Sequence, residues 1–260
     1  MIIPQWPAPD NVKALATERE VSAAGVGHSL SPYHSLNLGD HVNDHPNCVT
    51  HNRQLLLDYA QGCQEIRWLQ QVHGTDCPDA HLVENSIKAD ASFTQTPALG
   101  CAVMTADCLP VLFCDLQGRQ VAAAHAGWRG LAQGILANTL TTFVSNGIKT
   151  NQVIAWLGPA ISQAAFEVGP DVRLAFEHFD EGQSWADEQC FMAGQGDRLQ
   201  ANLYRLARLQ LEHLGIAGVY GDEALCTFST LDQHNDHRFF SYRRQAVTGR
   251  QASLIWLAGS

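Results

Sequence analysis

The segment VAAAHAGWRGLAQGI, residues 121–135, decides how the middle of the chain folds. Its first residues, 121–124, are small and apolar, which predicts a buried strand that ends at His125. Beyond AGWRG, residues 131–145 carry apolar side chains every three or four positions and stop at Asn146-Gly147, a pattern typical of an amphipathic helix with a C-terminal cap. The segment therefore predicts a histidine at a strand end, beside the start of a helix.

Similar patterns on both sides of this segment predict further elements. We expect strands at residues 65–72, 101–105, 110–114, 153–157 and 252–257, and helices at residues 49–59 and 201–214. Because strands and helices do not alternate strictly, their order predicts an α+β fold with mixed β-sheets and flanking helices. The chain has 260 residues, 45% of them hydrophobic, and no repeat or long polar linker, so we expect a single domain over residues 1–260.

The charge balance argues against polyanionic partners. Lys and Arg number 16 against 26 Asp and Glu, the net charge is -10, and no basic tract is present to bind a polynucleotide. The first residues, MIIPQWPAPD, lack the basic flank and apolar core of a signal peptide, and no apolar run approaches the roughly 20 residues of a membrane helix. We therefore expect a cytoplasmic protein that acts on small molecules, without nucleic acid or membrane as a partner.

Three dispersed residues form a candidate metal site. Eight cysteines occur without a CxxC pair, so a zinc finger is not indicated and any metal must take ligands from distant segments. His73, Cys108 and His125 stand at predicted strand ends, and one thiolate with two imidazoles suits zinc. Three protein ligands leave a fourth position open, as in catalytic zinc sites. The spacings of 35 and 17 residues match no short metal motif, so ordinary core packing of the three is an open alternative.

Several long motifs resemble one known family. The chain resembles the YfiH-like laccase-domain proteins in three stretches, WLQQVHG (68–74), MTADCLPVLFCD (104–115) and VAAAHAGWRGLAQGI (121–135). Further stretches extend the match over nearly the whole chain, namely SLNLGDHV, HNR, WLGPAI, FEVGPDV and FFSYRR. The resemblance implies a zinc site at His73, Cys108 and His125, in a fold similar to the cysteine-hydrolase domain of the CNF toxin.

The resemblance also implies an activity. Members of this family are described as purine nucleoside phosphorylases, polyphenol oxidases and peptidoglycan-editing factors. The implied reactions are phosphorolysis of adenosine, inosine and 5′-methylthioadenosine, and deamination of adenosine. Deamination at a metal centre requires a carboxylate that moves protons, and Asp107, beside Cys108, is the candidate; a structural hydrogen-bonding role is the alternative. The HxE and PCxxC signature of other zinc deaminases does not occur.

Phosphorolysis requires a phosphate site, for which an arginine fork or backbone amides at a helix start are suited. Arg53 follows the family-like Asn52, Arg129 opens the helix after His125, and Arg243 lies in FFSYRR. These three arginines are the phosphate-binding candidates. The alternative for each is an ion-paired surface arginine.

Three other functions stay open at this stage. Copper-dependent phenol oxidation is one, although the 12 histidines include no HxH pair of the kind multicopper centres use, and the nearest pairs, His41/His45 and His234/His237, suit solvated loops. A second is an amide or ester hydrolase, with Cys108 as nucleophile and His125 as base, acting for example on peptidoglycan precursors. A third is a non-catalytic, zinc-stabilised binding protein.

Overall fold

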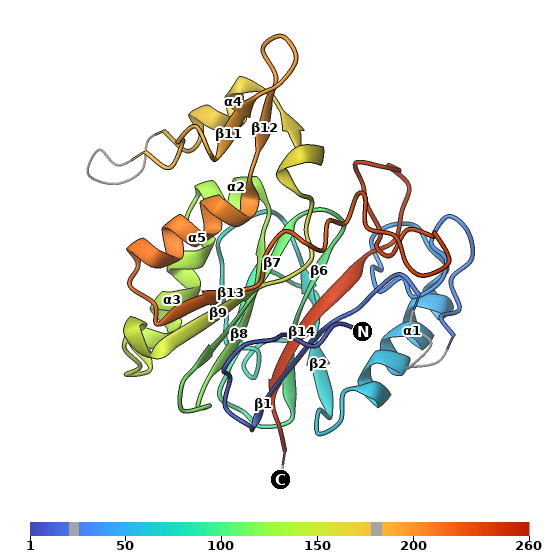
Figure 1. Cartoon of the computed structure of the whole chain (residues 1–260). Coiled ribbons are helices and arrows are strands. Elements are labelled where there is room, and N and C mark those ends of the chain that lie inside the picture. Colours follow the sequence, from blue (N-terminus) through green and yellow to red (C-terminus); the bar gives the residue numbers. More distant parts are fainter. Residues whose placement is uncertain (21–25, 178–183, 260) are drawn as a thin grey trace.

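Two mixed β-sheets form the centre of the computed structural model, which describes residues 1–20, 26–177 and 184–259 (Figure 1). In the five-stranded sheet the strand order is β13-β9-β7-β8-β5; β13 is parallel to β9 and the other neighbours are antiparallel. These strands are β5 (Ala91–Thr94), β7 (Leu109–Asp115), β8 (Val121–Ala126), β9 (Val153–Leu157) and β13 (Gly218–Tyr220).

The four-stranded sheet has the order β1-β14-β6-β2, in which β2 is parallel to β6 and the other neighbours are antiparallel. Its strands are β1 (Val12–Ala16), β2 (Glu65–Arg67), β6 (Leu99–Thr105) and β14 (Gln251–Leu257). Shorter strands pair outside these sheets: β3 (Leu69–Gln70) with β4 (Ile87–Lys88), and β12 (Leu199–Ala201) with β10 (Glu167–Val168) and β11 (Phe191–Ala193).

The sheets pack face to face, and helices cover their outer faces (Figure 1). Side chains of a strand alternate between its two faces, so Leu112 and Ala123 meet the four-stranded sheet while Phe113 and Ala124 meet helices. Burial of a side chain as large as Phe113 stabilises the fold by about 1.5–3 kcal/mol. Helices α3 (Ile135–Ser145) and α5 (Leu203–His213) cover the five-stranded sheet, and α1 (Pro46–Tyr59) covers the other.

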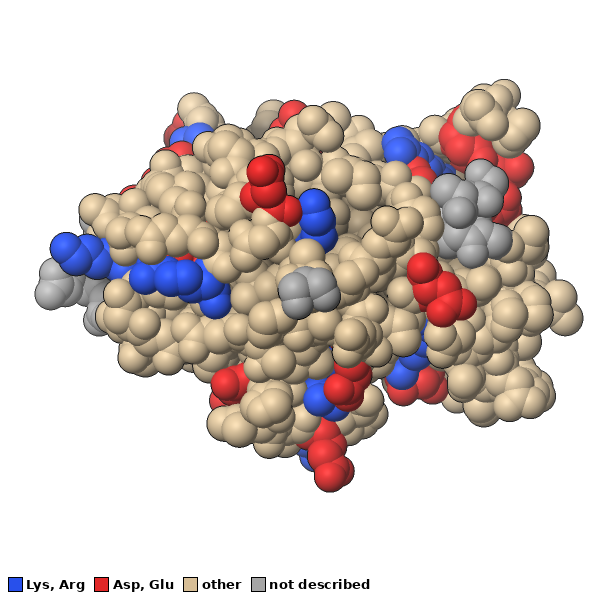
Figure 2. Space-filling view, turned by 90° about the horizontal axis from the view of Figure 1, so that it is seen from below, with Lys and Arg blue, Asp and Glu red and all other residues tan. Residues whose placement is uncertain are grey.

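The remaining helical segments are short. Helix α2 (Trp128–Ala132) follows β8, and α4 (Pro170–Leu174) follows β10. Single 3-10 turns, η1 (Thr150–Gln152) and η2 (Gln163–Ala165), precede β9 and β10. Within the described ranges, none of the helices has the length and apolar character needed to span a membrane. On the face in Figure 2, small groups of acidic and basic side chains are scattered over a mostly uncharged surface.

The α+β prediction with mixed sheets and flanking helices is confirmed, but two predicted elements are wrong in detail. The predicted strand at 65–72 is two strands, β2 and β3, because the chain leaves β6 after Arg67 and then pairs with β4. His73 therefore lies in the loop beyond β3 rather than at the end of a long strand. The predicted helix at 131–145 is likewise two helices, α2 and α3, because Gly134 takes a left-handed φ of 92° that ends one helix before the other begins.

Helix boundaries follow local capping. Helix α1 begins three residues before the predicted start, since Pro46 fits the first turn and the His45 side chain accepts a hydrogen bond from the Asn47 N–H. Helix α5 begins at Leu203 because the Asn202 side chain accepts from the Arg205 N–H, 2.9 Å away. Both helices thus differ from the prediction only at their ends.

Candidate metal centre

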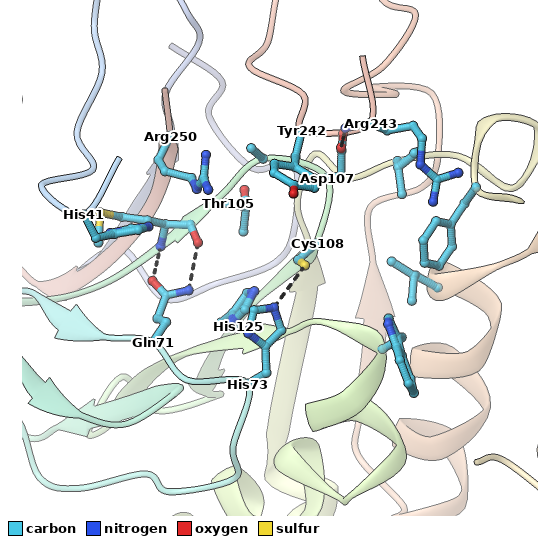
Figure 3. A pocket seen from close by; sticks show the side chains of 16 residues that line it. His41, Gln71, His73, Thr105, Asp107, Cys108, His125, Tyr242, Arg243 and Arg250 are labelled. Atoms are coloured by element: carbon cyan, nitrogen blue, oxygen red, sulfur yellow. Dashed lines mark hydrogen bonds between the residues drawn. The ribbon is translucent and has the colours of Figure 1, made fainter. Parts of the chain in front are cut away.

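His73, Cys108 and His125 converge at one end of the two sheets (Figure 3). His73 follows β3 with a positive φ of 60°, Cys108 lies in the turn from β6 to β7, and His125 lies on β8. The turn contains Asp107 with a φ of 98°, a conformation that Asp adopts more readily than most residues. The antiparallel pairing of β7 with β8, in which Pro110 lies opposite His125, brings Cys108 to His125, and the loop after β3 adds His73.

The spacing of the donor atoms fits a shared metal ion. Zinc lies about 2.3 Å from a thiolate and about 2.0–2.1 Å from an imidazole nitrogen, so two of its ligands are at most about 4.4 Å apart. Cys108 Sγ lies 4.0 Å from His73 Nε2, and the donor atoms of all three residues lie within 4.8 Å of one another. At tetrahedral angles the same bond lengths place ligand atoms about 3.3–3.6 Å apart, so the three donor atoms would close together by up to about an ångström around one ion. The described residues contain no other group of His, Cys, Asp and Glu with this geometry.

Asp90 orients two of the three candidate ligands. Its carboxylate is fully buried and lies 2.8 Å from His125 Nδ1, which leaves Nε2 of that ring for a metal. The same carboxylate accepts backbone hydrogen bonds from Val72, His73 and Gly74, at 3.0, 2.9 and 2.7 Å. Burial alone would raise the pKa of Asp90, but the hydrogen bonds from His125 and Gly74 lower it below its ordinary value. Asp90 is therefore ionised and fixes both the histidine ring and the loop.

Two glycines of AGWRG leave room for the ligands. A Cβ at Gly127 would lie 2.9 Å from His73 Cδ2 and 3.1 Å from Cys108 Sγ. A Cβ at Gly130 would lie 3.0 Å from the carbonyl oxygen of Gly74, in the loop that carries His73. Any larger residue at Gly127 would push the ligands apart, so this segment serves the site as well as the fold.

The electrostatics favour a thiolate. Burial opposes ionisation of Cys108, but His125 and His73 outweigh it by charge and hydrogen bonding, and the pKa of the thiol falls to about 6. Burial likewise opposes protonation of His125, but the Cys108 thiolate and Asp90 raise its pKa to about 9. Without a metal the two groups therefore form a thiolate–imidazolium pair, and a cation bound there would replace the proton on the side of the ring that faces the sulfur.

The three ligands open into a cavity of about 360 Å³. Figure 3 shows the polar side chains of His41, Thr105 and Arg250 together on one side of Cys108, the polar wall; four apolar lining side chains belong to one core cluster and form the apolar wall. Gln71 also lines the cavity, and its amide accepts from Met104 N–H at 2.7 Å and donates to Met104 O at 2.8 Å, which ties the His73 loop to β6. The apolar wall is formed by Trp128, Ile161, Phe166 and Leu203; the polar wall includes His41, Thr105 and Arg250.

The other residues singled out in the sequence differ in their placement. Asp107 lines the cavity, and its carboxylate oxygens accept from Thr227 Oγ1 at 2.7 Å and from Arg243 N–H at 2.6 Å. Arg243 also lines the cavity, with its guanidinium 5.4 Å from the centre of the Phe166 ring.

Arg53 and Arg129 lie outside the cavity lining. Arg53 donates to Leu38 O at 3.0 Å, pairs with Asp40 at 3.2 Å and covers the Trp68 ring. Arg129 is exposed, with its guanidinium 4.3 Å from the centre of the Trp128 ring. Their phosphate-binding roles remain predictions.

Two charged residues of the site were missed by the sequence reasoning. Asp90 directly precedes β5, and Arg250 directly precedes β14. A charged residue at the edge of a largely apolar strand was the available signal in both cases, but a solvated strand end gives the same pattern. Only the pairing of β5 with β8, and of β14 with β6, brings these side chains to the ligands.

Residues 18–258 match the family model described as multi-copper polyphenol oxidoreductase laccase. The chain therefore belongs to this family, the YfiH-like laccase-domain proteins.

Its relatives include proteins named as purine nucleoside phosphorylases. The one named YfiH from Escherichia coli is 46% identical, with 99% of this chain and 98% of the relative covered. One from Pseudomonas aeruginosa is 44% identical, with 98% of each chain covered. Among solved structures, a Neisseria meningitidis protein is 45% identical and superposes with a TM-score of 0.88 over 99% of each chain. Since the matches span almost the whole length of the relatives, the shared fold extends over the entire described chain.

Replacing Asp90 by Asn should weaken zinc binding about 10–100-fold, the usual effect of removing a carboxylate that supports a ligating histidine. The amide keeps the shape of Asp90 but loses its charge and one of the two acceptor oxygens. The measurement is a competition titration with a chromophoric chelator. Asp58→Asn, an exposed position on α1 that accepts from Gln54, is the matched control and should bind zinc as the wild type does. Equal affinities in the two variants would show that Asp90 does not support the ligands.

In protein stripped of metal by a chelator, iodoacetamide should alkylate Cys108 at a rate that rises with pH through a midpoint near 6. The reason is that the thiolate is the nucleophile and the pKa of Cys108 is lowered to about 6. Cys63, half-buried and with a pKa raised to about 11 by burial, is an internal control that should stay unmodified at neutral pH. Peptide mass spectrometry follows both sites. A Cys108 midpoint above 8 would contradict this description.

Proposed function

We propose that this protein is a zinc-dependent purine nucleoside phosphorylase that acts on adenosine, inosine and 5′-methylthioadenosine. The observation that carries the proposal is the three-residue ligand set opening into a cavity with one apolar and one polar wall. The names of the relatives from Escherichia coli and Pseudomonas aeruginosa support the same activity. A closed structural zinc site would use four protein ligands, whereas this set leaves a position open towards the cavity.

The cavity suits a purine nucleoside in size and in the distribution of polarity. Its volume of about 360 Å³ is within the range of small-ligand pockets, about 300–1,000 Å³. Trp128 and Phe166 offer aromatic surface to a flat base, and Ile161 and Leu203 complete that wall. The sugar and the phosphate would lie towards the ligands and the polar wall.

Phosphorolysis balances without a redox partner. An oxygen of HPO₄²⁻ forms a bond to C1′ of the ribose while the bond from C1′ to N9 of the purine breaks. The electron pair of that bond goes to N9, which takes up the proton that the phosphate loses. The products are the free base and ribose 1-phosphate, or 5-methylthioribose 1-phosphate when the substrate is 5′-methylthioadenosine. The side chains must therefore hold two substrates side by side and keep bulk water away from C1′.

Residues of the chain would bind the metal ion and position the substrates. His73, Cys108 and His125 would bind the zinc ion, which supplies a Lewis acid and a means of activating water at neutral pH. Asp90 keeps the His125 ring in the orientation that presents Nε2. Arg243 extends over the Phe166 ring at the edge of the apolar wall, where its guanidinium can donate a hydrogen bond to the purine.

Deamination of adenosine is the second activity of this proposal. In that reaction the oxygen of water bonds to C6 of adenine, the bond from C6 to the amino nitrogen breaks, and ammonia leaves with inosine as the other product. A group is needed that moves the proton from water to the leaving nitrogen. Asp107 is our candidate, since it lines the cavity and each of its two bonded oxygens keeps a second lone pair.

A cysteine hydrolase, such as an editing enzyme acting on peptidoglycan precursors, is a second candidate function supported by one specific observation. Asp90, His125 and Cys108 are arranged in the order acid, base and nucleophile, with the carboxylate 2.8 Å from His125 Nδ1 and the Cys108 thiolate interacting with the same ring. This arrangement requires the metal-free state, because zinc bound to the sulfur would quench the nucleophile.

Copper at the same three ligands is the third possibility, and it alone would give a phenol oxidase. The family description names several coppers, whereas the described residues hold one candidate cluster. We therefore consider phenol oxidation less well supported than the nucleoside reactions. For all three candidates we propose small-molecule partners and a cytoplasmic location, and the net charge of -10 argues against a polynucleotide.

The proposal is tested by product analysis on protein whose metal content has been quantified. Adenosine is supplied with and without inorganic phosphate. Adenine and ribose 1-phosphate that form only with phosphate indicate phosphorolysis, and inosine indicates deamination. His73→Ala should lose zinc and both products, while His81→Ala, which changes an exposed histidine outside the cavity, should retain them. Zinc-loaded wild-type protein that forms neither product would refute the nucleoside proposal and favour the hydrolase.

A further inference from the structure

Thr105 carries an unused hydroxyl on the polar wall of the cavity. The residue is 2% exposed and lines the cavity, and its Oγ1 is buried. Among the described residues this oxygen has no hydrogen-bond partner. A buried hydroxyl without a partner destabilises a fold, because it has lost water and gained nothing in exchange. In Figure 3 the hydroxyl points into the space beside Arg250.

Arg250 carries unused donors on the same wall. Its Nη1 donates to Thr248 O at 3.1 Å and Gly249 O at 2.9 Å, which anchors one arm of the guanidinium. No described residue accepts from its Nε or Nη2. Burial lowers the pKa of Arg250 below its ordinary value, yet a guanidinium stays charged at neutral pH. The anchored arm holds the fork in place while the other donors remain available to a ligand.

Strand pairing holds the two groups together. Thr105 is the last residue of β6, and its register partner on β14 is Gln251, next to Arg250. The Arg250 backbone N–H also donates to Asn37 Oδ1 at 2.8 Å, which ties the start of β14 to the loop before α1. A ligand at this wall would therefore meet a hydroxyl and a guanidinium that the sheet has already fixed in position, with little further ordering needed.

We propose that Thr105 and Arg250 bind the inorganic phosphate of phosphorolysis, at the opposite end of the cavity from the purine. The inference rests on the proposed function. An arginine fork with an adjacent hydroxyl suits a phosphate dianion. The phosphate oxygen then attacks C1′ from the polar side as the bond to N9 breaks towards the apolar side, and N9 receives the proton released by HPO₄²⁻. Cys108 and His125 lie between the two walls, where the sugar would be placed.

The placement of the arginines supports phosphate binding at the polar wall and purine binding at the apolar wall. Arg243, over the Phe166 ring, is on the apolar side, and Arg53 is engaged with Leu38 and Asp40. Of the arginines, only Arg243 and Arg250 are among the described residues that line the cavity. Arg250 is thus the arginine that stands beside an unpartnered hydroxyl.

The test measures phosphate and adenosine dependence separately on zinc-loaded variants. Arg250→Gln should raise KM for phosphate about tenfold or more, the loss expected for a charge-assisted hydrogen bond, and Thr105→Val should raise it about three- to tenfold. KM for adenosine should change less than about twofold in both, since the base lies at the other wall. Thr105→Ser, which restores the hydroxyl, should restore the wild-type KM. Arg198→Gln, an exposed arginine outside the lining, is the matched control.

A stability measurement separates binding from a structural role. Thr105→Val keeps the shape of the side chain and removes an unpartnered hydroxyl, so its Tm without phosphate should equal or exceed that of the wild type. A lower Tm together with an unchanged KM for phosphate would overturn the inference. So would equal increases in KM for phosphate and for adenosine.

Direct calorimetric titration with inorganic phosphate keeps this inference distinguishable from the proposed function. If the wild type forms no ribose 1-phosphate, the proposed function fails, and the titration alone decides the subsite. Phosphate binding by the wild type, weakened about tenfold in Arg250→Gln, supports it. Absence of phosphate binding to the wild type, or equal binding by the wild type and Arg250→Gln, overturns it. Titration with acetate should give no comparable binding, because a carboxylate carries a smaller charge and fewer acceptors.

Discussion

The carboxylate of Asp90 links the segments from which the candidate metal centre is built. It accepts hydrogen bonds from the backbone of Val72, His73 and Gly74 and lies 2.8 Å from His125 Nδ1. The His125 N–H donates to the Asp90 carbonyl oxygen at 2.7 Å, so the same residue is joined to β8 twice. A buried carboxylate with this many donors is stable only as an anion, and the anion in turn sets the position of one ligand loop and one ligand ring.

Packing around the centre serves the same arrangement. The small residues of β8 fit between the two layers of the core, with Ala123 towards the four-stranded sheet and Ala124 towards the helices. Gly127 then lets the chain pass within contact of His73 and Cys108 before α2 begins. The segment 121–135 is therefore constrained twice, by the close approach of the layers and by the space that the candidate ligands need.

The sequence predicted strands and candidate site residues where a local signal, such as an apolar run or a family motif, was sufficient. Apolar runs located β6, β7, β8, β9 and β14, and the family motifs pointed to His73, Cys108 and His125, which the fold brings together as a candidate ligand set. It was not informative where the outcome depended on pairing. The break after Arg67 follows from a change of partner strand, and Asp90 and Arg250 join the site only through β5–β8 and β14–β6 pairing. Periodicity along one chain segment does not encode which segment lies beside it.

The central claim is that His73, Cys108 and His125 hold one zinc ion with an open fourth position. X-ray absorption at the zinc edge, on protein purified without added metal, tests it most directly. We predict a first coordination shell with one sulfur atom at about 2.3 Å. The same shell should contain two imidazole nitrogens and one oxygen atom from water at about 2.0–2.1 Å. Protein without bound zinc, or a shell with two or more sulfurs, would contradict the account.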